Sequence, residues 1–181
     1  MPVALPTELP ESTLLAQLRR NGSYADCFTL TLPIAATQAQ FIEAFYTTKL
    51  FKAERLILRL LAGKRSTDQQ AAELAAGSGS SFAVWQVTER TAGEILLTDE
   101  TGRTSSWLMA VPNFTSRGSS TRLFFGSAIK PRRPSTAGGQ PQFGRLFHGL
   151  LGLHNLYSRR LLEAAAHRLT AKAVQRARGD A

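Results

Sequence analysis

Residues 142–172 read QFGRLFHGLLGLHNLYSRRLLEAAAHRLTAK, and this stretch decides the fold that the sequence predicts. Residues with a three-to-four spacing give it one face that is typical of a long, half-buried helix. That face comprises Phe143, Phe147, Leu150, His154, Tyr157, Leu161 and Ala165. Three glycines fall in its first third, each costing about 1 kcal/mol relative to alanine in a helix interior. This part of the helix is therefore expected either to contact another backbone closely or to leave space for a ligand.

Strand-like sequence precedes the helix. From Phe82 the period of the apolar residues changes from helical to alternating, which is typical of β-strands. Strands are expected over residues 82–88, 94–98, 104–111 and 121–130. The turns between consecutive strands are short, so neighbours should pair antiparallel. The segment 130–141 contains three prolines and two glycines, cannot continue a sheet, and should lead into the helix.

The first eighty residues predict one more strand and several helices. A helix is expected over residues 11–20, closed by Asn21-Gly22, and a strand over 24–32. Thr37 with Gln40, and Thr67 with Gln70, have the spacing of a capping box and predict two helix starts. Weak helix propensity around residues 47–48 indicates that the run to Leu61 is two helices rather than one. Counting all strands gives five.

Composition and charge describe an ordinary globular chain with one basic region. Of its 181 residues, 43% are hydrophobic and 19% are charged, which lies outside the range of disordered chains. Residues 130–181 contain ten Lys or Arg against two acids, whereas residues 1–129 are nearly neutral. The single cysteine, Cys27, excludes an intramolecular disulfide. The sequence shows no secretory signal and no membrane-span pattern, so a cytoplasmic location is expected.

The element order is one strand, helices, an antiparallel meander and a long C-terminal helix. It predicts an α+β fold of the helix-grip class. The chain resembles the SRPBCC superfamily, whose members include START-like and birch-pollen-allergen-like proteins, and within it an uncharacterised bacterial family. The motifs that carry this resemblance are YADCF at residues 24–28, GEILL at 93–97 and HNLYSRRLL at 154–162. We expect one helix-grip domain over residues 23–172, an N-terminal extension over 1–22 with a short helix, and a basic tail over 173–181.

The resemblance implies a curved antiparallel sheet wrapped around the last helix, with an apolar cavity between them. Such a cavity would bind a small hydrophobic ligand, either lipid-like or aromatic. The expected lining residues come from the strands and the helix face: Trp85, Trp107, Met109, Phe125, Phe147, Leu150, His154 and Tyr157. Buried Trp and Tyr side chains would bring polar groups to such a pocket. The competing interpretation is that these aromatic residues are core, buried for their area alone.

Catalytic and metal-binding patterns are absent from the sequence. His148 and His154 are six residues apart and point in different directions on a helix, so no metal site is expected. There is no GxSxG motif and no phosphate-binding loop, and no cofactor is expected. His154 and Tyr157, one turn apart on the inward face, form the best polar pair and could act on a ligand. The favoured interpretation is that His154 is a hydrogen-bonded core histidine.

Two further hypotheses belong to other classes of protein. The basic C-terminal helix could be an interaction module for an anionic membrane, a nucleic acid or an acidic protein. No aromatic residues alternate with its charges, no nucleic-acid reader motif occurs, and its apolar face is needed for the core, so neither nucleic acid nor membrane has strong support. Alternatively, the same cavity could be the active site of a cyclase- or hydrolase-like enzyme. The sequence leaves a homo-oligomer open.

Overall fold

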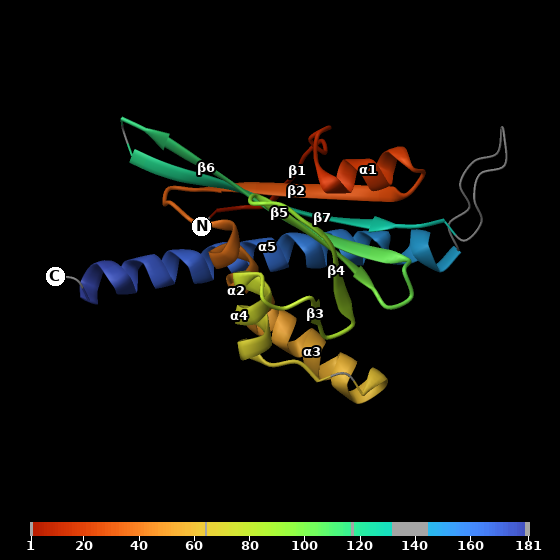
Figure 1. Cartoon of the computed structure of the whole chain (residues 1–181). Coiled ribbons are helices and arrows are strands. Elements are labelled where there is room, and N and C mark those ends of the chain that lie inside the picture. The colour runs from red at the N-terminus through yellow and green to blue at the C-terminus, as the bar shows by residue number, and fades with distance from the viewer. Residues whose placement is uncertain (1, 64, 117, 132–144, 180–181) are drawn as a thin grey trace.

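A seven-stranded antiparallel sheet carries the long C-terminal helix on one face and a short helix on the other in the computed structural model (Figure 1). The structure describes residues 2–63, 65–116, 118–131 and 145–179, with only the backbone of 58, 61–62 and 145–151. Over these residues the α+β class is confirmed. The helices are α1 (Leu14–Arg20), α2 (Gln38–Tyr46), α3 (Lys49–Ala62), α4 (Asp68–Ala76) and α5 (Arg145–Gly179). The expected linker at 130–141 lies almost entirely outside the described residues.

The strands of the sheet follow the order β1-β2-β7-β6-β5-β4-β3, and every neighbouring pair is antiparallel. Their bounds are β1 (Leu5–Pro6), β2 (Tyr24–Leu32), β3 (Ser81–Phe82), β4 (Trp85–Arg90), β5 (Glu94–Asp99), β6 (Thr104–Thr115) and β7 (Gly118–Ile129). Strands β3 to β7 form the predicted meander. Strand β2 then pairs along its whole length with β7, which places the first long strand of the chain beside the last.

The expected count of five strands was too low. The described residues form seven, because the two-residue strand β1 is too short to show an alternating pattern and the strand expected over 82–88 is broken by a turn. Ala83, with a φ of 56°, lies in that turn, so the stretch forms the β3–β4 hairpin instead of one strand. The segment expected to be an N-terminal extension supplies β1 and α1, and Leu14 and Leu15 of α1 are buried. Strand β6 also continues through Pro112 to the hairpin, beyond the predicted end at residue 111.

Threonine side chains fix the helix starts. The hydroxyls of Thr37 and Thr67 accept hydrogen bonds from the backbone N–H groups of Gln40 and Gln70, whose side chains bond back. Both predicted capping boxes are therefore confirmed, and each satisfies two N–H groups that a helix end leaves unpaired. Thr48 caps α3 in the same way, so the run to residue 62 is two helices, as the weak propensity predicts.

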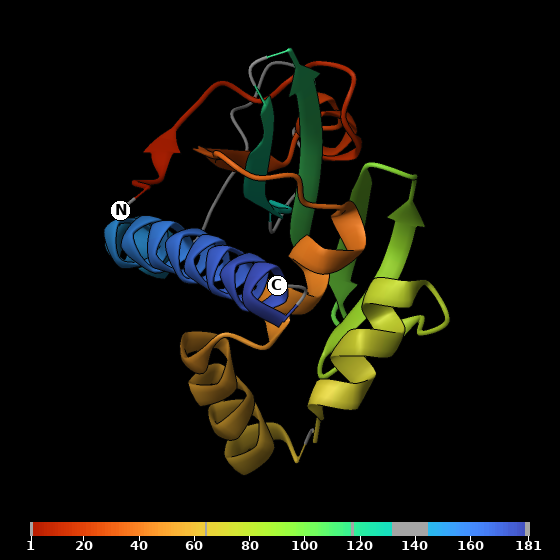
Figure 2. The same ribbon diagram turned by 90° about the vertical axis from the view of Figure 1, so that its left-hand side faces the viewer.

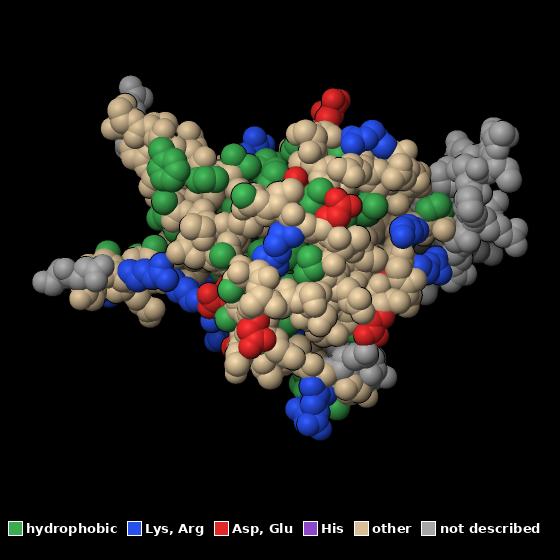
Figure 3. Space-filling view, in the orientation of Figure 1, with side chains coloured by type: hydrophobic (Ala, Val, Ile, Leu, Met, Phe, Trp, Pro, Cys, Tyr) green, Lys and Arg blue, Asp and Glu red, His purple; other side chains and the backbone are tan. Residues whose placement is uncertain are grey.

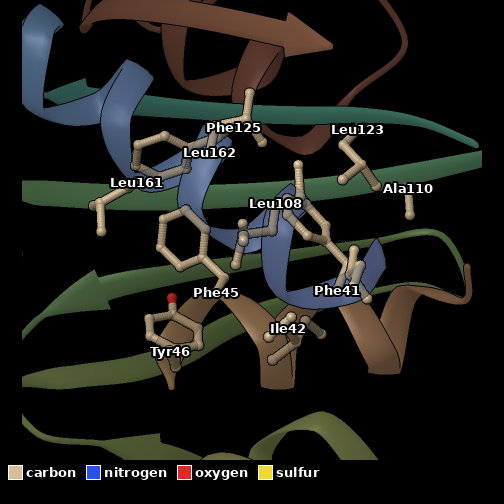
Figure 4. Packing of buried hydrophobic residues seen from close by; sticks show 14 of the residues in the cluster. Phe41, Ile42, Phe45, Tyr46, Leu108, Ala110, Leu123, Phe125, Leu161 and Leu162 are labelled. Carbon is tan, nitrogen blue, oxygen red and sulfur yellow. The ribbon is translucent and has the colours of Figure 1, made fainter. Parts of the chain in front are cut away.

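The main core lies between the sheet and the helices α2, α4 and α5 (Figure 2). Phe45 of α2 stands at its centre, 1% exposed, with its ring centroid 4.7 Å from that of Phe125 on β7. Leu161 and Leu162 of α5 pack against the same group of side chains (Figure 4). Aromatic rings at these separations add stability beyond the area that they bury.

A second, smaller core lies on the opposite face of the sheet, beneath α1. It holds Leu15, Leu96, Trp107 and Phe124, and neighbours such as Phe124 and Phe125 point to opposite faces as predicted. Both faces of the central strands are thus covered, in keeping with their two-sided apolar sequence. Gly126 sits where α1 approaches closely, since a Cβ atom there would lie 2.5 Å from Leu15 Cδ2.

Candidate functional site

The face of the sheet toward α5 changes from apolar to polar along the strands. The strand register places Phe28, Phe125, Leu108 and Ile95 side by side across four strands, and we call these residues the apolar row. Two residues further along each strand stand Asp26, Ser127, Ser106 and Leu97, which we call the polar row. Because side chains alternate between faces, both rows point to the same side of the sheet. The polar row is the starting point for a candidate site.

Asp26, Ser127 and His154 form a closed polar triangle between the sheet and α5. Ser127 Oγ lies 2.9 Å from Asp26 Oδ1 and 2.8 Å from His154 Nε2, and that nitrogen lies 3.1 Å from Asp26 Oδ2. The backbone N–H of Ser127 also donates to Asp26 Oδ1 over 3.0 Å. The Asp26 side chain is 9% exposed; the hydrogen bonds to Oδ1 compensate for part of its burial, whereas Oδ2 has no hydrogen-bond partner among the described residues and only the ion-pair contact with His154.

The triangle differs from a catalytic Ser-His-Asp triad. In a triad one imidazole nitrogen takes the serine proton while the other is held by the acid. Here the same nitrogen, Nε2, faces both partners, so no second imidazole nitrogen is held by Asp26 while Nε2 takes the serine proton. The serine is therefore not activated as a nucleophile, and the three side chains act as a polar clasp between β2, β7 and α5.

Glu54 and Tyr157 form a second polar contact, which joins α3 to α5. The Tyr157 hydroxyl donates to Glu54 Oε2. Burial raises the pKa of the Glu54 carboxyl, and the hydrogen bond from Tyr157 offsets part of that rise. The pKa of Tyr157 is also raised, first by burial and then by the nearby Glu54 charge. Both groups thus hold their protons more firmly than they would in water.

Several polar atoms on this side of the sheet are buried without a hydrogen-bond partner among the described residues. They include Trp85 Nε1, Tyr46 OH and Ser158 Oγ. Tyr46 and Ser158 are completely buried. Burial raises the pKa of Tyr46, and hydrogen bonding with Ser106 offsets part of that rise, although the contact lies outside ordinary hydrogen-bond geometry. Buried polar groups are normally paired, so unpaired ones mark a place where another group could bind.

Two of these donors belong to residues that pack in the same core as Phe82. The ring centroid of Phe82 is 5.1 Å from that of Tyr46, and the strand register pairs Phe82 with Trp85. The indole N–H of Trp85 and the hydroxyl of Tyr46 therefore come from different elements to the same region. This region lies at the β3–β4 edge of the sheet, next to the face toward α5 where the sequence predicts a pocket.

The structure divides the residues predicted to line a pocket into two groups. Trp85, Phe125, His154 and Tyr157 lie on the α5 side of the sheet. Trp107 and Met109 lie on the opposite side with α1, so they do not share a pocket with the helix residues. Trp107 Nε1 donates to Glu94 Oε2 over 2.6 Å, which pairs its polar atom within the second core. The side chains of Phe147 and Leu150 lie outside the described residues.

The predicted pair of His154 and Tyr157 does not act together. His154 turns toward Asp26 and Ser127, whereas Tyr157 turns toward Glu54 on α3. The sequence analysis missed Asp26 and Ser158 as site residues. A signal for both was present, since Asp26 is a charged residue in phase with Phe28 on an apolar strand face, and Ser158 lies on the buried face of α5 between His154 and Leu161.

A surface groove of about 550 Å³ runs along the other side of α5, next to the N-terminal residues. Three of its charged side chains are already paired: Arg159 with the Ala4 carbonyl, and Arg160 and Glu163 with one another. Glu163 also accepts from the Ala4 N–H. These contacts fasten the N-terminal segment to α5 and leave the groove a weaker candidate than the polar row.

Among the described residues, no group of three His, Cys, Asp or Glu side chains could hold a metal ion. None of the helices, over the same residues, combines the length and the apolar content needed to cross a membrane. The pKa of the buried Cys27 thiol is raised to about 12 by burial, with Asp26 adding to the shift, so this thiol is unreactive at neutral pH.

Comparison with known proteins assigns no family to this chain. No model of a known protein family matches the chain. No curated protein matches it either. Among solved structures, the chain is similar to an uncharacterised protein from Rhizobium leguminosarum, with 10% identity, a TM-score of 0.32, and coverage of 81% of this chain and 97% of that one. We base no argument on so low a TM-score.

Proposed function

We propose that this protein is a helix-grip, SRPBCC-like binder of a small amphipathic molecule, held between the polar row and α5. The ligand would present an apolar body, lipid-like or aromatic, and at least one hydroxyl or carbonyl oxygen. The apolar row would limit how deeply the ligand enters, and the Glu54–Tyr157 contact would border the ligand on the α3 side. The sheet order and the helix across its face support the helix-grip class.

One observation carries this proposal: two buried donors belong to residues packed in the core around Phe82, namely Trp85 Nε1, which has no hydrogen-bond partner among the described residues, and the Tyr46 hydroxyl, which interacts with Ser106 only outside ordinary hydrogen-bond geometry. Leaving a buried donor unpaired costs about 1–3 kcal/mol. A ligand oxygen that accepts from either donor would recover that cost. The aromatic rings around Phe82 would provide the apolar contact area that small-molecule sites use.

The enzyme alternative has less support. The polar clasp lacks the geometry that activates a serine, and His154 and Tyr157 are directed at different protein partners. We therefore assign no catalytic role to these residues. The proposed function is binding.

The test is native mass spectrometry of the protein as purified from cells, followed by denaturing extraction of any small molecule. Tyr46→Phe keeps the ring and removes the hydroxyl, whereas Trp85→Phe replaces the indole by a smaller aromatic ring without a donor, and both are expected to lower ligand occupancy. Trp107→Phe is the matched control, because it removes an indole N–H that is already bonded to Glu94 on the opposite face. Its ligand occupancy should equal that of the wild type.

An apo wild-type mass, together with no saturable binding of added fatty acids or of an environment-sensitive apolar dye, would contradict the proposal. Equal loss of ligand in all three variants would also contradict it, because a general loosening of the fold would then explain the result. Circular dichroism of each variant establishes that it is folded before the comparison is made.

A further inference from the structure

Helix α3 carries an exposed apolar stripe that the core does not use. Its inner side holds Phe51, which is 3% exposed, and Glu54, which is bonded to Tyr157. On its outer side Leu56 and Ile57 are each 54% exposed and Leu60 is 74% exposed. Together with the exposed Ala53, these residues follow three-to-four spacing and so form one continuous stripe. We call these four residues the α3 stripe.

The charges beside the α3 stripe are all positive. Lys49, Lys52 and Arg59 are exposed on the same helix, and Arg65 is exposed just after it. The only acid of the helix, Glu54, faces inward to Tyr157. Asp68 of α4 pairs with Lys52 and Arg55 and neutralises part of this charge, but among the described residues no acid pairs with Lys49 or Arg59. The outer side of α3 is therefore cationic and amphipathic.

The position of α3 exposes the stripe on a ridge. In Figure 2 the helix stands at the lower edge of the molecule, away from the sheet, with only its inner side toward α5. In the space-filling view, a basic side chain stands beside hydrophobic ones at the lower end of the molecule, in the region of α3 (Figure 3). A convex ridge suits insertion between lipid headgroups better than capture of a peptide, which usually needs a groove.

We infer that α3 docks on the surface of an anionic lipid bilayer. The stripe would enter the boundary between headgroups and acyl chains, as basic amphipathic helices do. Lys49, Lys52 and Arg59 would remain at headgroup level, attracted by the anionic lipids while their aliphatic stems stay apolar. This surface is distinct from the proposed ligand site and from the basic end of α5.

Two other occupants fit the charge less well. A second copy of the chain meeting the same stripe would bring the unpaired Lys49 and Arg59 of both copies together, and like charges across an interface oppose association. A single-stranded nucleic acid usually needs aromatic side chains on which bases stack. The α3 stripe contains only aliphatic residues.

The experiment is vesicle co-sedimentation of the full chain with phosphatidylcholine alone and with a mixture of phosphatidylcholine and phosphatidylglycerol. The wild type should sediment with the anionic vesicles, and added salt should weaken its binding. The double variant L56S/L60S should lose at least about tenfold in partition coefficient, because it removes most of the apolar stripe. The double variant K49E/R59E should lose binding to the anionic vesicles by a similar factor.

Two controls place the effect on α3. Phe114→Ser removes a side chain that is 72% exposed on the β6–β7 hairpin, and R176E/R178E reverses the exposed charges near the end of α5. Both controls should bind vesicles like the wild type. Circular dichroism checks that all four variants are folded.

The inference fails if the wild type stays in the supernatant with anionic vesicles, or if the α3 variants bind as the wild type does. It also fails if R176E/R178E alone abolishes binding, because the α5 end would then be the docking surface. Light scattering decides the case of a second copy: a wild-type dimer that L56S/L60S converts to monomer would assign the stripe to self-association.

Discussion

Along α5, one half of the interface with the sheet is packed with hydrocarbon, whereas the other half is polar. In the apolar half, Leu161 and Leu162 face the apolar row and the aromatic residues of α2. In the polar half, His154 is bonded to Ser127 of the polar row, and Ser158 is completely buried nearby on the same helix. Both halves belong to the same helix and to the same sheet face. The comparison indicates that the apolar half stabilises the fold, while the polar half retains costly groups for which binding is the proposed reason.

The largest effect is expected in the apolar half. Phe45→Ala should lower the free energy of unfolding by about 3–5 kcal/mol, because it opens a cavity among rings that cannot close around it. Urea unfolding followed by circular dichroism measures this change. A loss below about 1 kcal/mol would mean that the site collapses readily and that this half is less tightly packed than the structure indicates.

The opposite face of the same strands provides the second prediction. Gly126→Ala should cost about 1–3 kcal/mol, because overpacking forces neighbours to move. Its Cβ would lie 2.6 Å from the Asp26 carbonyl oxygen, which is backbone and cannot turn away. Gly93→Ala is the matched control, since its Cβ would meet nothing nearer than 3.9 Å. Equal stability of the two variants in urea would show that both α1 and the β2 backbone can shift without cost.

The pH dependence of stability sharpens the comparison within the polar half. Burial raises the pKa of Glu54 above its ordinary value near 4.5, so the folded chain keeps this proton at pH values where the unfolded chain has lost it. The resulting stabilisation is present in full below that ordinary value and is lost as the pH rises through the folded-state pKa. Glu54→Gln removes the titration. The unfolding free energy of the wild type minus that of the variant should therefore fall as the pH rises above about 4.5.

Urea unfolding of both proteins at several pH values gives this difference directly. A difference that stays constant with pH, or that rises, would show that Glu54 is ionised in the folded state with an ordinary or lowered pKa. The Glu54–Tyr157 contact would then be a simple charged hydrogen bond. Glu73→Gln on the exposed face of α4 is a suitable control for general charge effects.

The smallest effect is expected at Ser158. Ser158→Ala should leave the stability unchanged or raise it by up to about 1 kcal/mol, because it removes a buried hydroxyl without a described partner and introduces the best helix former. Ser127→Ala should instead cost about 1 kcal/mol, because it breaks the hydrogen bonds to Asp26 and His154. Thermal unfolding compares the two variants. A destabilised Ser158→Ala would mean that the hydroxyl is hydrogen-bonded after all.

The sequence predicted the local elements well because their signals are short-range. Capping at Thr37 and Thr67 depends on residues three positions apart, and the alternation in β6 and β7 depends on nearest neighbours. At Gly126 the regular register on either side excludes a bulge, so the glycine serves a close approach that only the tertiary structure shows. The short strand β1 was missed because two residues cannot show a period, and the turn between β3 and β4 was missed because alternating residues 82–88 carry no glycine or proline to mark it.

The candidate site could be predicted only in part. His154 and Tyr157 were recognised from their positions on the buried face of α5, but their partners lie far away in the sequence, on β2, β7 and α3. Trp107 was assigned to the pocket because it is aromatic and central. The structure places it on the α1 face, where Glu94 binds its indole N–H.

By itself, the sequence determined the approximate positions of most helices and long strands, which residues share a strand face, and that the long C-terminal helix is amphipathic. These properties follow from caps, alternation and spacing, which act over a few residues. Only the tertiary structure decided which face of the sheet α5 covers and which polar groups meet there. Both faces of β6 and β7 are apolar, so alternation separates Leu108 from Trp107 without saying which of them lies beneath the helix.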